Sequence, residues 1–209
     1  AVAGAFGLWH ILQAGRQLTR WLAAALLGLA MLGGLVYTFS SFQSKIRQNT
    51  NDDQAIGLAP GPRLDGIAWF AQKFPDEWAG IVWLREHVTG SPVIAEAAGG
   101  AYNIEESRFG MATGLPSVMG WTNHEGQWRG SAYGLVAERP DQLQTLYQVR
   151  DWTAAQAILD RYQIEFVIVG NLERTKYNPV YPAKFEQHMD IAFQSGTLTI
   201  YRRKPQAAQ

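Results

Sequence analysis

An apolar run near the start of the chain is its clearest hydrophobic pattern. Residues 21–37 contain no charged side chain, and with residues 38–42 the run reaches about 22 residues. A helix of that length, rising ~1.5 Å per residue, crosses the ~30 Å hydrocarbon core of a bilayer. Trp21 and Tyr37 stand where aromatic residues gather at the two membrane surfaces. The pattern predicts a transmembrane helix over about 20–42, with a buried helix of a soluble protein as the alternative.

A second apolar stretch, residues 1–14, opens the chain and is a candidate for the end of a preceding span. Residues 15–20 would then form a tight connection, and residues 1–48 together the membrane segment. A secretory signal peptide begins with basic residues, whereas here the apolar residues come first. We therefore expect a late segment of a longer polytopic membrane protein, with a processed N-terminus as the alternative.

The pattern becomes polar after residue 48. Prolines and glycines at 58–63 predict a connector over 49–63, followed by a folded domain over 64–204 and a tail over 205–209. Within the domain, some segments show the helical period of apolar residues and others consist of short apolar runs typical of strands.

The spacing of apolar residues predicts three helices in the domain. The first covers 76–88, between a proline and a glycine. The second opens at Asp141, with Gln144 in position to complete a capping box. Asp151 caps the third, which covers 152–162.

Consecutive apolar residues at 92–97 and 165–170 predict strands buried on both faces of a sheet. Residues 193–203, turned at Ser195 and Gly196, predict a C-terminal edge hairpin. Helices and strands thus alternate, so the expected fold class is α/β. We predict an N-terminal transmembrane helix followed by a small, mostly parallel sheet flanked by helices.

Residues 98–134 contain no predicted element longer than a short strand and are interpreted as a long Gly-rich loop. The stretch 113–130 holds two Trp, a His, a Glu and an Arg among its glycines, with neither a helical nor a strand period. Long loops in compact domains are commonly functional, and aromatic and ionisable side chains suit a site for a polar ligand. This stretch is therefore the first candidate site.

Charge separates the membrane segment from the domain. The formal net charge is zero, but residues 1–50 carry four basic and no acidic side chains, so the remainder is acidic by the same amount. Arg16 and Arg20 precede the predicted span, and Lys45 and Arg47 follow it, so the positive-inside rule assigns no orientation. The neutral chain suggests no nucleic-acid partner. The lack of cysteine excludes disulfides and thiolate metal sites.

His124 and Glu125 begin like the zinc-protease motif H-E-x-x-H, but Trp128 replaces the second histidine, so no metal site is predicted. The pair is a candidate acid/base or ligand-binding pair, and the alternative is a hydrogen-bonded pair that shapes the loop. Walker A, G-x-G-x-x-G and G-x-S-x-G motifs are also missing. The sequence therefore indicates no cofactor and identifies no catalytic residue.

Aromatic and basic residues extend the candidate site. Trp121 and Trp128 suit stacking on a sugar ring or a flat lipid-linked group, with burial as anchors of the loop as the alternative. Arg108 and Arg129 suit a phosphate or carboxylate clamp. Their alternative role is in salt bridges, for which the sequence offers Glu96, Glu105, Glu106 and Glu125.

Residues after the two predicted buried strands complete the set of candidates. Glu96 ends the first strand, and Glu173 and Arg174 follow the second. Ligand sites in open α/β sheets gather at the carboxyl ends of strands, so these side chains are expected in one crevice. The alternative is that Glu173 and Arg174 pair with each other.

Several short motifs between residues 60 and 203 resemble those of one family of membrane proteins. They are Leu64–Gly66, Ala79–Leu84, Val93–Gly99, Tyr102, Ser107–Arg108, Thr113–Pro116, Gly120–Trp121, His124–Glu125, Gln127–Gly130, Val169–Arg174 and Tyr177. The family is Chlor_Arch_YYY, uncharacterised polytopic membrane proteins of archaea and chloroflexi, which looks like a branch of the GT-C-type glycosyltransferases. Such enzymes move a sugar from a lipid-phosphate carrier at the outer face of the membrane.

The resemblance implies that the domain lies on the extracytoplasmic side of the cell membrane, as the C-terminal part of a glycosyltransferase-like protein. Its implied role is recognition of the acceptor or of the lipid-phosphate-linked sugar. The implied partners are membrane lipid, a lipid-linked sugar and other membrane subunits. In these enzymes the catalytic carboxylate lies in an early extracytoplasmic loop, so the resemblance assigns no catalytic residue here. The alternative is an accessory subunit of a larger membrane complex, with the Gly-rich loop as its docking surface.

Overall fold

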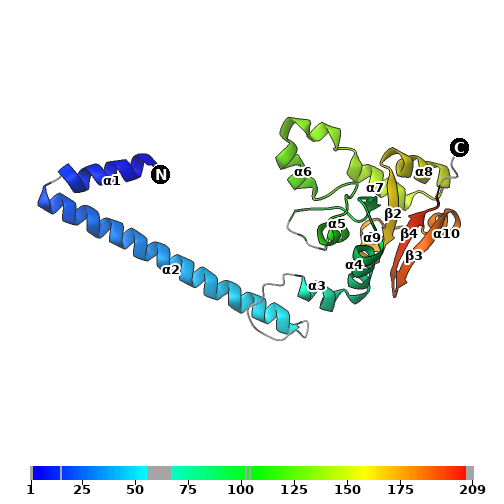
Figure 1. Cartoon of the computed structure of the whole chain (residues 1–209), viewed down its shortest axis with the longest axis horizontal. Coiled ribbons are helices and arrows are strands. Elements are labelled where there is room, and N and C mark those ends of the chain that lie inside the picture. Colours follow the sequence, from blue (N-terminus) through cyan, green and yellow to red (C-terminus); the bar gives the residue numbers. More distant parts are fainter. Residues whose placement is uncertain (1, 15, 56–66, 102, 104, 206–209) are drawn as a thin grey trace. The chain divides into compact units, whose positions relative to one another are not determined.

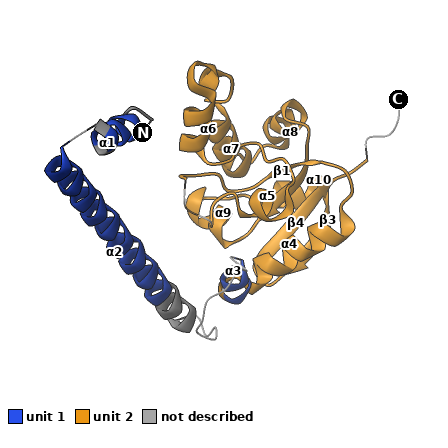
Figure 2. Cartoon of the chain, turned by 60° about the vertical axis from the view of Figure 1, so that its left-hand side comes forward, with its two compact units in different colours: residues 1–72 blue, residues 73–209 orange. Residues whose placement is uncertain are grey.

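The computed structural model describes residues 2–14, 16–55, 67–101, 103 and 105–205 (Figure 1). The chain forms two compact units, residues 1–72 and residues 73–209 (Figure 2). The first unit is helical wherever it is regular, and the second contains the sheet.

The N-terminal unit contains α1 (Val2–Ala14) and α2 (Gln17–Ala55), and α3 (Ala68–Lys73) begins at its end. Within α2, residues 17–48 include an 18-residue window with a mean hydropathy of 2.0, and that window is 0% buried. Among the described residues, this is the one helix long and apolar enough to cross a bilayer. The predicted apolar helix is therefore confirmed.

The bounds of α2 differ from the sequence prediction at both ends. Residues 17–20, expected in a tight connection, form its first turn, and residues 49–55, expected in the connector, form its last turns. The rest of the predicted connector, including 58–63, lies outside the described residues.

The second unit contains most of the regular elements. In chain order they are α4 (Pro75–His87), β1 (Val93–Ala95), α5 (Arg108–Thr113), α6 (Thr122–Arg129), the 3-10 helix η1 (Gly130–Leu135), α7 (Arg139–Gln148), α8 (Trp152–Arg161), β2 (Ile164–Val169), α9 (Asn171–Lys176), α10 (Ala183–His188), β3 (Met189–Ser195) and β4 (Leu198–Arg203). This mixture of helices with one small sheet confirms the α/β class.

The sheet has the strand order β1-β2-β4-β3. β1 and β2 are parallel, with Ile94 opposite Phe166, whereas β2–β4 and β4–β3 are antiparallel. The prediction of a mostly parallel sheet is therefore wrong, although the parallel pair exists. The reason is the C-terminal hairpin: its second strand pairs with β2, so both hairpin strands join the sheet with antiparallel neighbours. The predicted edge hairpin is confirmed, with β3 starting at Met189.

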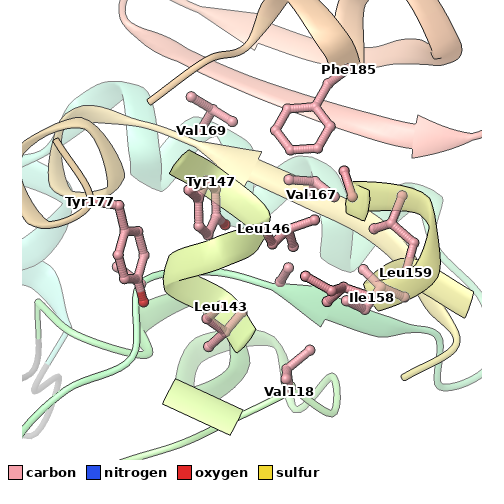
Figure 3. Close-up of a cluster of buried hydrophobic side chains, with 14 of the residues drawn as sticks. Val118, Leu143, Leu146, Tyr147, Ile158, Leu159, Val167, Val169, Tyr177 and Phe185 are labelled. Atoms are coloured by element: carbon pink, nitrogen blue, oxygen red, sulfur yellow. The ribbon is translucent and has the colours of Figure 1, made fainter. Parts of the chain in front are cut away.

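Helices cover both faces of the sheet. On one face, α7 and α8 pack with Val167 and Val169 of β2 to form the main apolar cluster (Figure 3). On the other face α4 approaches closely, because a Cβ on Gly80 would lie 2.5 Å from Leu198 Cδ2 and 3.3 Å from Ile200 Cδ1. Alternate residues of a strand point to opposite faces, which explains why β2 is apolar at consecutive positions.

Two of the three predicted helices agree with the structure, and the third starts elsewhere. α4 and α8 occur as predicted, and the Asp151 carboxylate accepts a hydrogen bond from Ala154 N at 2.8 Å. α7 begins at Arg139, two residues before Asp141, and has no side-chain cap. The predicted capping box is therefore wrong. A proline in the first turn favours this earlier start, because its fixed φ suits a helix beginning.

The predicted loop between residues 98 and 134 is instead partly helical. It contains α5, α6 and η1. α6 has no fully buried residue, so it lacks the apolar period by which helices are predicted from sequence. Gly126 within it packs against the Tyr133 ring of η1, 3.7 Å from an added Cβ. The Gly-rich stretch thus contains short helices and is not an irregular loop throughout.

Candidate functional site

The structure separates the predicted site residues into two groups. One group lies at the carboxyl ends of β1 and β2, where all its members but the half-buried Arg174 are buried, and the other lies on or next to α6. The first comprises Glu96, Arg108, Glu173 and Arg174, and the second Trp121, His124, Glu125, Trp128 and Arg129.

Arg108, the first residue of α5, lies at the centre of the buried group. Its Nη1 and Nη2 donate to the two carboxylate oxygens of Glu173, each at 3.0 Å, and its Nε donates to Glu77. The side chain of Arg108 is 1% exposed. A guanidinium with two carboxylates fills its planar fork of donors, so these three residues form one ionic unit, the Arg108 cluster.

Glu173 connects the Arg108 cluster to both strands. Its Oε1 accepts from Ala97 N at 2.8 Å, just after β1, and its Oε2 accepts from Gly170 N at 2.9 Å, just after β2. Burial alone would raise the pKa of Glu173, but Arg108 and the two N–H donors outweigh burial and hold the pKa below its ordinary value. Glu173 is therefore an ionised link between two strand ends.

Glu77 of α4 is a member of the Arg108 cluster that the sequence did not predict. Its pKa is raised, because burial outweighs the attraction of Arg108. The helical period of the sequence could have identified Glu77. The buried residues of α4 are Glu77, Gly80, Ile81 and Leu84, which share one face at helical spacing. A glutamate within that apolar stripe must be buried and needs a cation.

Glu96 holds the start of α5 over the end of β1. Its two oxygens accept from Phe109 N at 2.8 Å and from Gly110 N at 2.7 Å. A carboxylate at free N–H groups of a helix start is stabilising. Burial nevertheless raises the pKa of Glu96 to about 7, against the lowering effects of Arg108 and of the two hydrogen bonds.

Glu96, Arg108 and Glu173 therefore lie together at the strand ends, but their polar groups are bonded to the protein itself. Arg108 forms ion pairs, although its partners are Glu77 and Glu173 and not the glutamates expected from sequence. Arg174 does not pair with Glu173: its Nη1 donates to the carbonyls of Val169 at 3.2 Å and Thr197 at 2.6 Å. These contacts fasten α4, α5, α9 and the strand ends to one another.

The second group starts at Trp121, immediately before α6. Its Nε1 donates to the carbonyl of Glu106 at 3.0 Å, and its backbone forms a bridge with Gly99. The His124 ring stands edge-on to the Trp121 ring, with 5.4 Å between ring centroids. Trp121 and His124 thus connect α6 to the segment that follows β1.

Glu125, Trp128 and Arg129 lie on α6 itself. Glu125 and Arg129 form an i,i+4 ion pair, with 2.5 Å between Arg129 Nε and Glu125 Oε2. The salt-bridge alternative is confirmed for Arg129. Trp128 is 84% exposed, so the anchor alternative does not apply to this ring. The α6 group therefore presents an uncovered indole and, on the next residue, a partly exposed guanidinium.

This arrangement has two chemical capabilities. An exposed indole offers a flat apolar face to a sugar ring or an acyl chain. Exposed ion pairs contribute little to stability, so Arg129 can exchange Glu125 for a phosphate at small cost. No group of three or more His, Asp or Glu side chains that could hold a metal ion occurs within the described part of the chain.

Comparison with known proteins gives one structural likeness. No protein-family model matches the chain, and no curated protein matches it. Among solved structures, the chain is similar to the C-terminal globular domain of an oligosaccharyltransferase from Archaeoglobus fulgidus. The TM-score is 0.39 at 11% sequence identity, and the match covers 61% of this chain and 95% of the other. A likeness of this degree assigns neither a family nor an activity.

Proposed function

We propose that this chain is the C-terminal, extracytoplasmic domain of a membrane glycosyltransferase-like protein, anchored by α2. In this proposal the α6 group recognises a lipid-phosphate-linked sugar or its acceptor. Trp128 stacks on the sugar ring, Arg129 binds the carrier phosphate, and Trp121, His124 and Glu125 shape the surface around them. Catalysis is assigned to none of these residues.

The observation that carries the proposal is the joint exposure of Trp128 and Arg129 on one short helix. The side chain of Arg129 is 42% exposed and that of its partner Glu125 is 28% exposed. A sugar phosphate requires both a flat apolar surface and a forked donor, and these two residues are adjacent in sequence. The resemblance of the motifs around them to a GT-C-like family, and the apolar helix α2, also support the proposal.

The buried group supports recognition by a different means. The Arg108 cluster and Glu96 fix the start of α5 and the strand ends, and Trp121 fastens the start of α6 to the segment between them. A recognition surface is more effective when the elements beneath it hold it in place. In this proposal the buried group positions the surface, and the α6 group makes the contacts.

Binding of a polyprenyl-phosphate monosaccharide with a radiolabelled sugar tests the proposal. The full chain in lipid nanodiscs should retain the label, and Arg129→Ala or Trp128→Ala should lose most of it. Arg161→Ala is the matched control, because Arg161 is also an exposed arginine in an ion pair, with Glu138 on another part of the domain. Unchanged binding in both α6 variants would refute the proposal.

If the longer protein transfers sugar, His124→Ala and Arg129→Ala in it should abolish transfer while the domain stays folded by circular dichroism. The alternative function is that of an accessory subunit whose α6 surface docks on a larger membrane complex. Exposure of Trp128 favours that role as well. It predicts co-purification of a partner that Trp128→Ala releases, with no binding of the sugar phosphate.

A further inference from the structure

We propose that the surface formed by the end of α6 and by η1 rests on the lipid interface of the membrane that holds α2. This surface, the α6 face, consists of the exposed residues between 127 and 135, with Trp128 and Leu135 as its apolar side chains. The proposal rests on the membrane anchorage that the proposed function includes. It does not depend on recognition of a sugar.

The apolar exposure of the α6 face is the first argument. Trp128 is 84% and Leu135 76% exposed, more than any other large apolar side chain described in residues 73–205. The two elements pack against each other at the periphery of the second unit, away from the sheet (Figures 1 and 2). Large apolar side chains that are exposed to water on two short helices indicate a surface that another apolar phase covers.

Charge is the second argument. Between residues 112 and 137 the ionisable side chains other than Tyr133 are His124, Glu125 and Arg129, and the last two form an ion pair. The region therefore has no net formal charge, so a surface of zwitterionic lipid neither attracts nor repels it through net charge. Tryptophan is enriched at membrane interfaces because its ring is apolar and its N–H is polar.

The tether is the third argument. Residues 49–72 separate the apolar part of α2 from the second unit, and a chain of that length reaches about 80 Å at most. The linker therefore sets an upper limit on the distance between the domain and the bilayer. A tethered surface meets its target at a high effective concentration, so a weak contact is enough to hold it.

Size favours lipid over a protein partner. A protein interface of standard size buries about 800 Å² on each partner. The α6 face offers two large apolar side chains, each able to bury at most about 250 Å². That is too little for an independent protein complex but suits insertion of a Trp and a Leu into the lipid headgroup region.

A fluorescent probe at a single cysteine tests the proposal, since the chain contains no cysteine of its own. Ala132→Cys lies in the exposed η1 segment and leaves Trp128 and Leu135 in place. The full chain labelled there with an NBD dye is placed in phosphatidylcholine nanodiscs with and without acyl chains spin-labelled at carbon 5. We expect the spin-labelled lipid to quench most of the emission.

Two comparisons make the experiment decisive. Ile191→Cys, at an exposed apolar position of the edge strand β3, should be quenched far less. Adding Trp128→Ser and Leu135→Ser to Ala132→Cys should remove the quenching, with the far-UV circular dichroism unchanged. Equal quenching at positions 132 and 191, or quenching that survives both serine substitutions, would overturn the proposal.

The lipid-only experiment also separates this inference from its alternatives. A dye at position 132 that is protected in native membranes but not quenched in pure lipid would identify a protein partner and refute the lipid contact. Loss of sugar-phosphate binding in Arg129→Ala bears on the proposed function alone. Loss of quenching in the double serine variant bears on the α6 face alone.

Discussion

At the scale of single residues, the domain depends on buried charge. Arg108 and Glu173 lie in the interior, and each buried charge is compensated by the opposite charge of the other. Removing charges from water costs several kcal/mol per ion, which is repaid only when geometry and hydrogen bonds are nearly ideal. The bidentate contact, together with the backbone donors to Glu173, meets that condition.

Arg108→Ala should therefore destabilise the domain by about 3–5 kcal/mol, because it leaves the carboxylates of Glu77 and Glu173 buried without a cation. Urea unfolding followed by circular dichroism measures the loss. Arg161→Ala, which removes an exposed ion pair, should cost less than about 1 kcal/mol. Equal effects of the two substitutions would contradict the burial argument.

The raised pKa of Glu96 predicts how the free energy of unfolding depends on pH. Its pKa is raised from the ordinary 4.5 to about 7 in the folded protein, so between these values the folded state binds the additional proton. The free energy of unfolding should fall as the pH rises from about 4.5 to 7, by on the order of 3 kcal/mol from this group. The raised pKa of Glu77 acts in the same direction.

Comparison with Glu96→Gln isolates the effect of Glu96. The glutamine has a single acceptor oxygen for two N–H donors, so the variant is less stable overall, but it does not titrate. Its stability should decline less steeply with pH over this window than that of the natural protein. Parallel pH profiles would show that Glu96 does not titrate there.

The sequence pattern placed Glu96 and Glu173 at the ends of the two strands, where the structure has them, and it missed Glu77. Ends of parallel neighbouring strands meet at one sheet edge, so residues following two buried strands can be brought together from the pattern alone. Glu77 precedes them on a helix, and its partner is known only once α4 lies on the sheet. Binding of a ligand by any of the candidate residues stays a prediction.

At the scale of elements, the N-cap predicted from the sequence agrees with the structure for α8 and differs from it for α7. The sequence suggests an N-cap at both Asp141 and Asp151, but of the two only the Asp151 side chain accepts a capping hydrogen bond from its helix. Asp151→Ala should lower stability by about 1 kcal/mol, whereas Asp141→Ala should cost a few tenths at most. Thermal unfolding of the two variants provides the comparison, and equal losses would contradict the assigned helix starts.

Elements that bury a full apolar face were predictable, and short elements on the surface were not. α4, α8, β2 and the hairpin each carry a clear period or apolar run. α6 carries neither, and it contains Gly126. Its helix is held by the pair of Glu125 and Arg129 and by contact with η1, neither of which leaves an apolar period in the sequence.

At the scale of the whole molecule, α2 should be the element that holds the protein in the membrane. We expect the chain to remain in the membrane pellet after alkaline carbonate extraction. Leu29→Arg combined with Leu32→Arg should release it, because each charge at the centre of a span costs about 2.5–3.5 kcal/mol. Leu135→Arg, outside α2, should not. Release of the natural chain by carbonate would contradict a spanning helix.

The sequence by itself determined the apolar helix, the α/β class, the strands β1 and β2 and the terminal hairpin. These are local properties, since apolar period and length act on each segment independently. The tertiary structure decided the antiparallel character of the sheet, the partners of Arg108 and the division of the candidate residues into a buried group and an exposed one. Those depend on which segments meet in space, and only after the chain has folded does burial distinguish a structural charge from one available to a ligand.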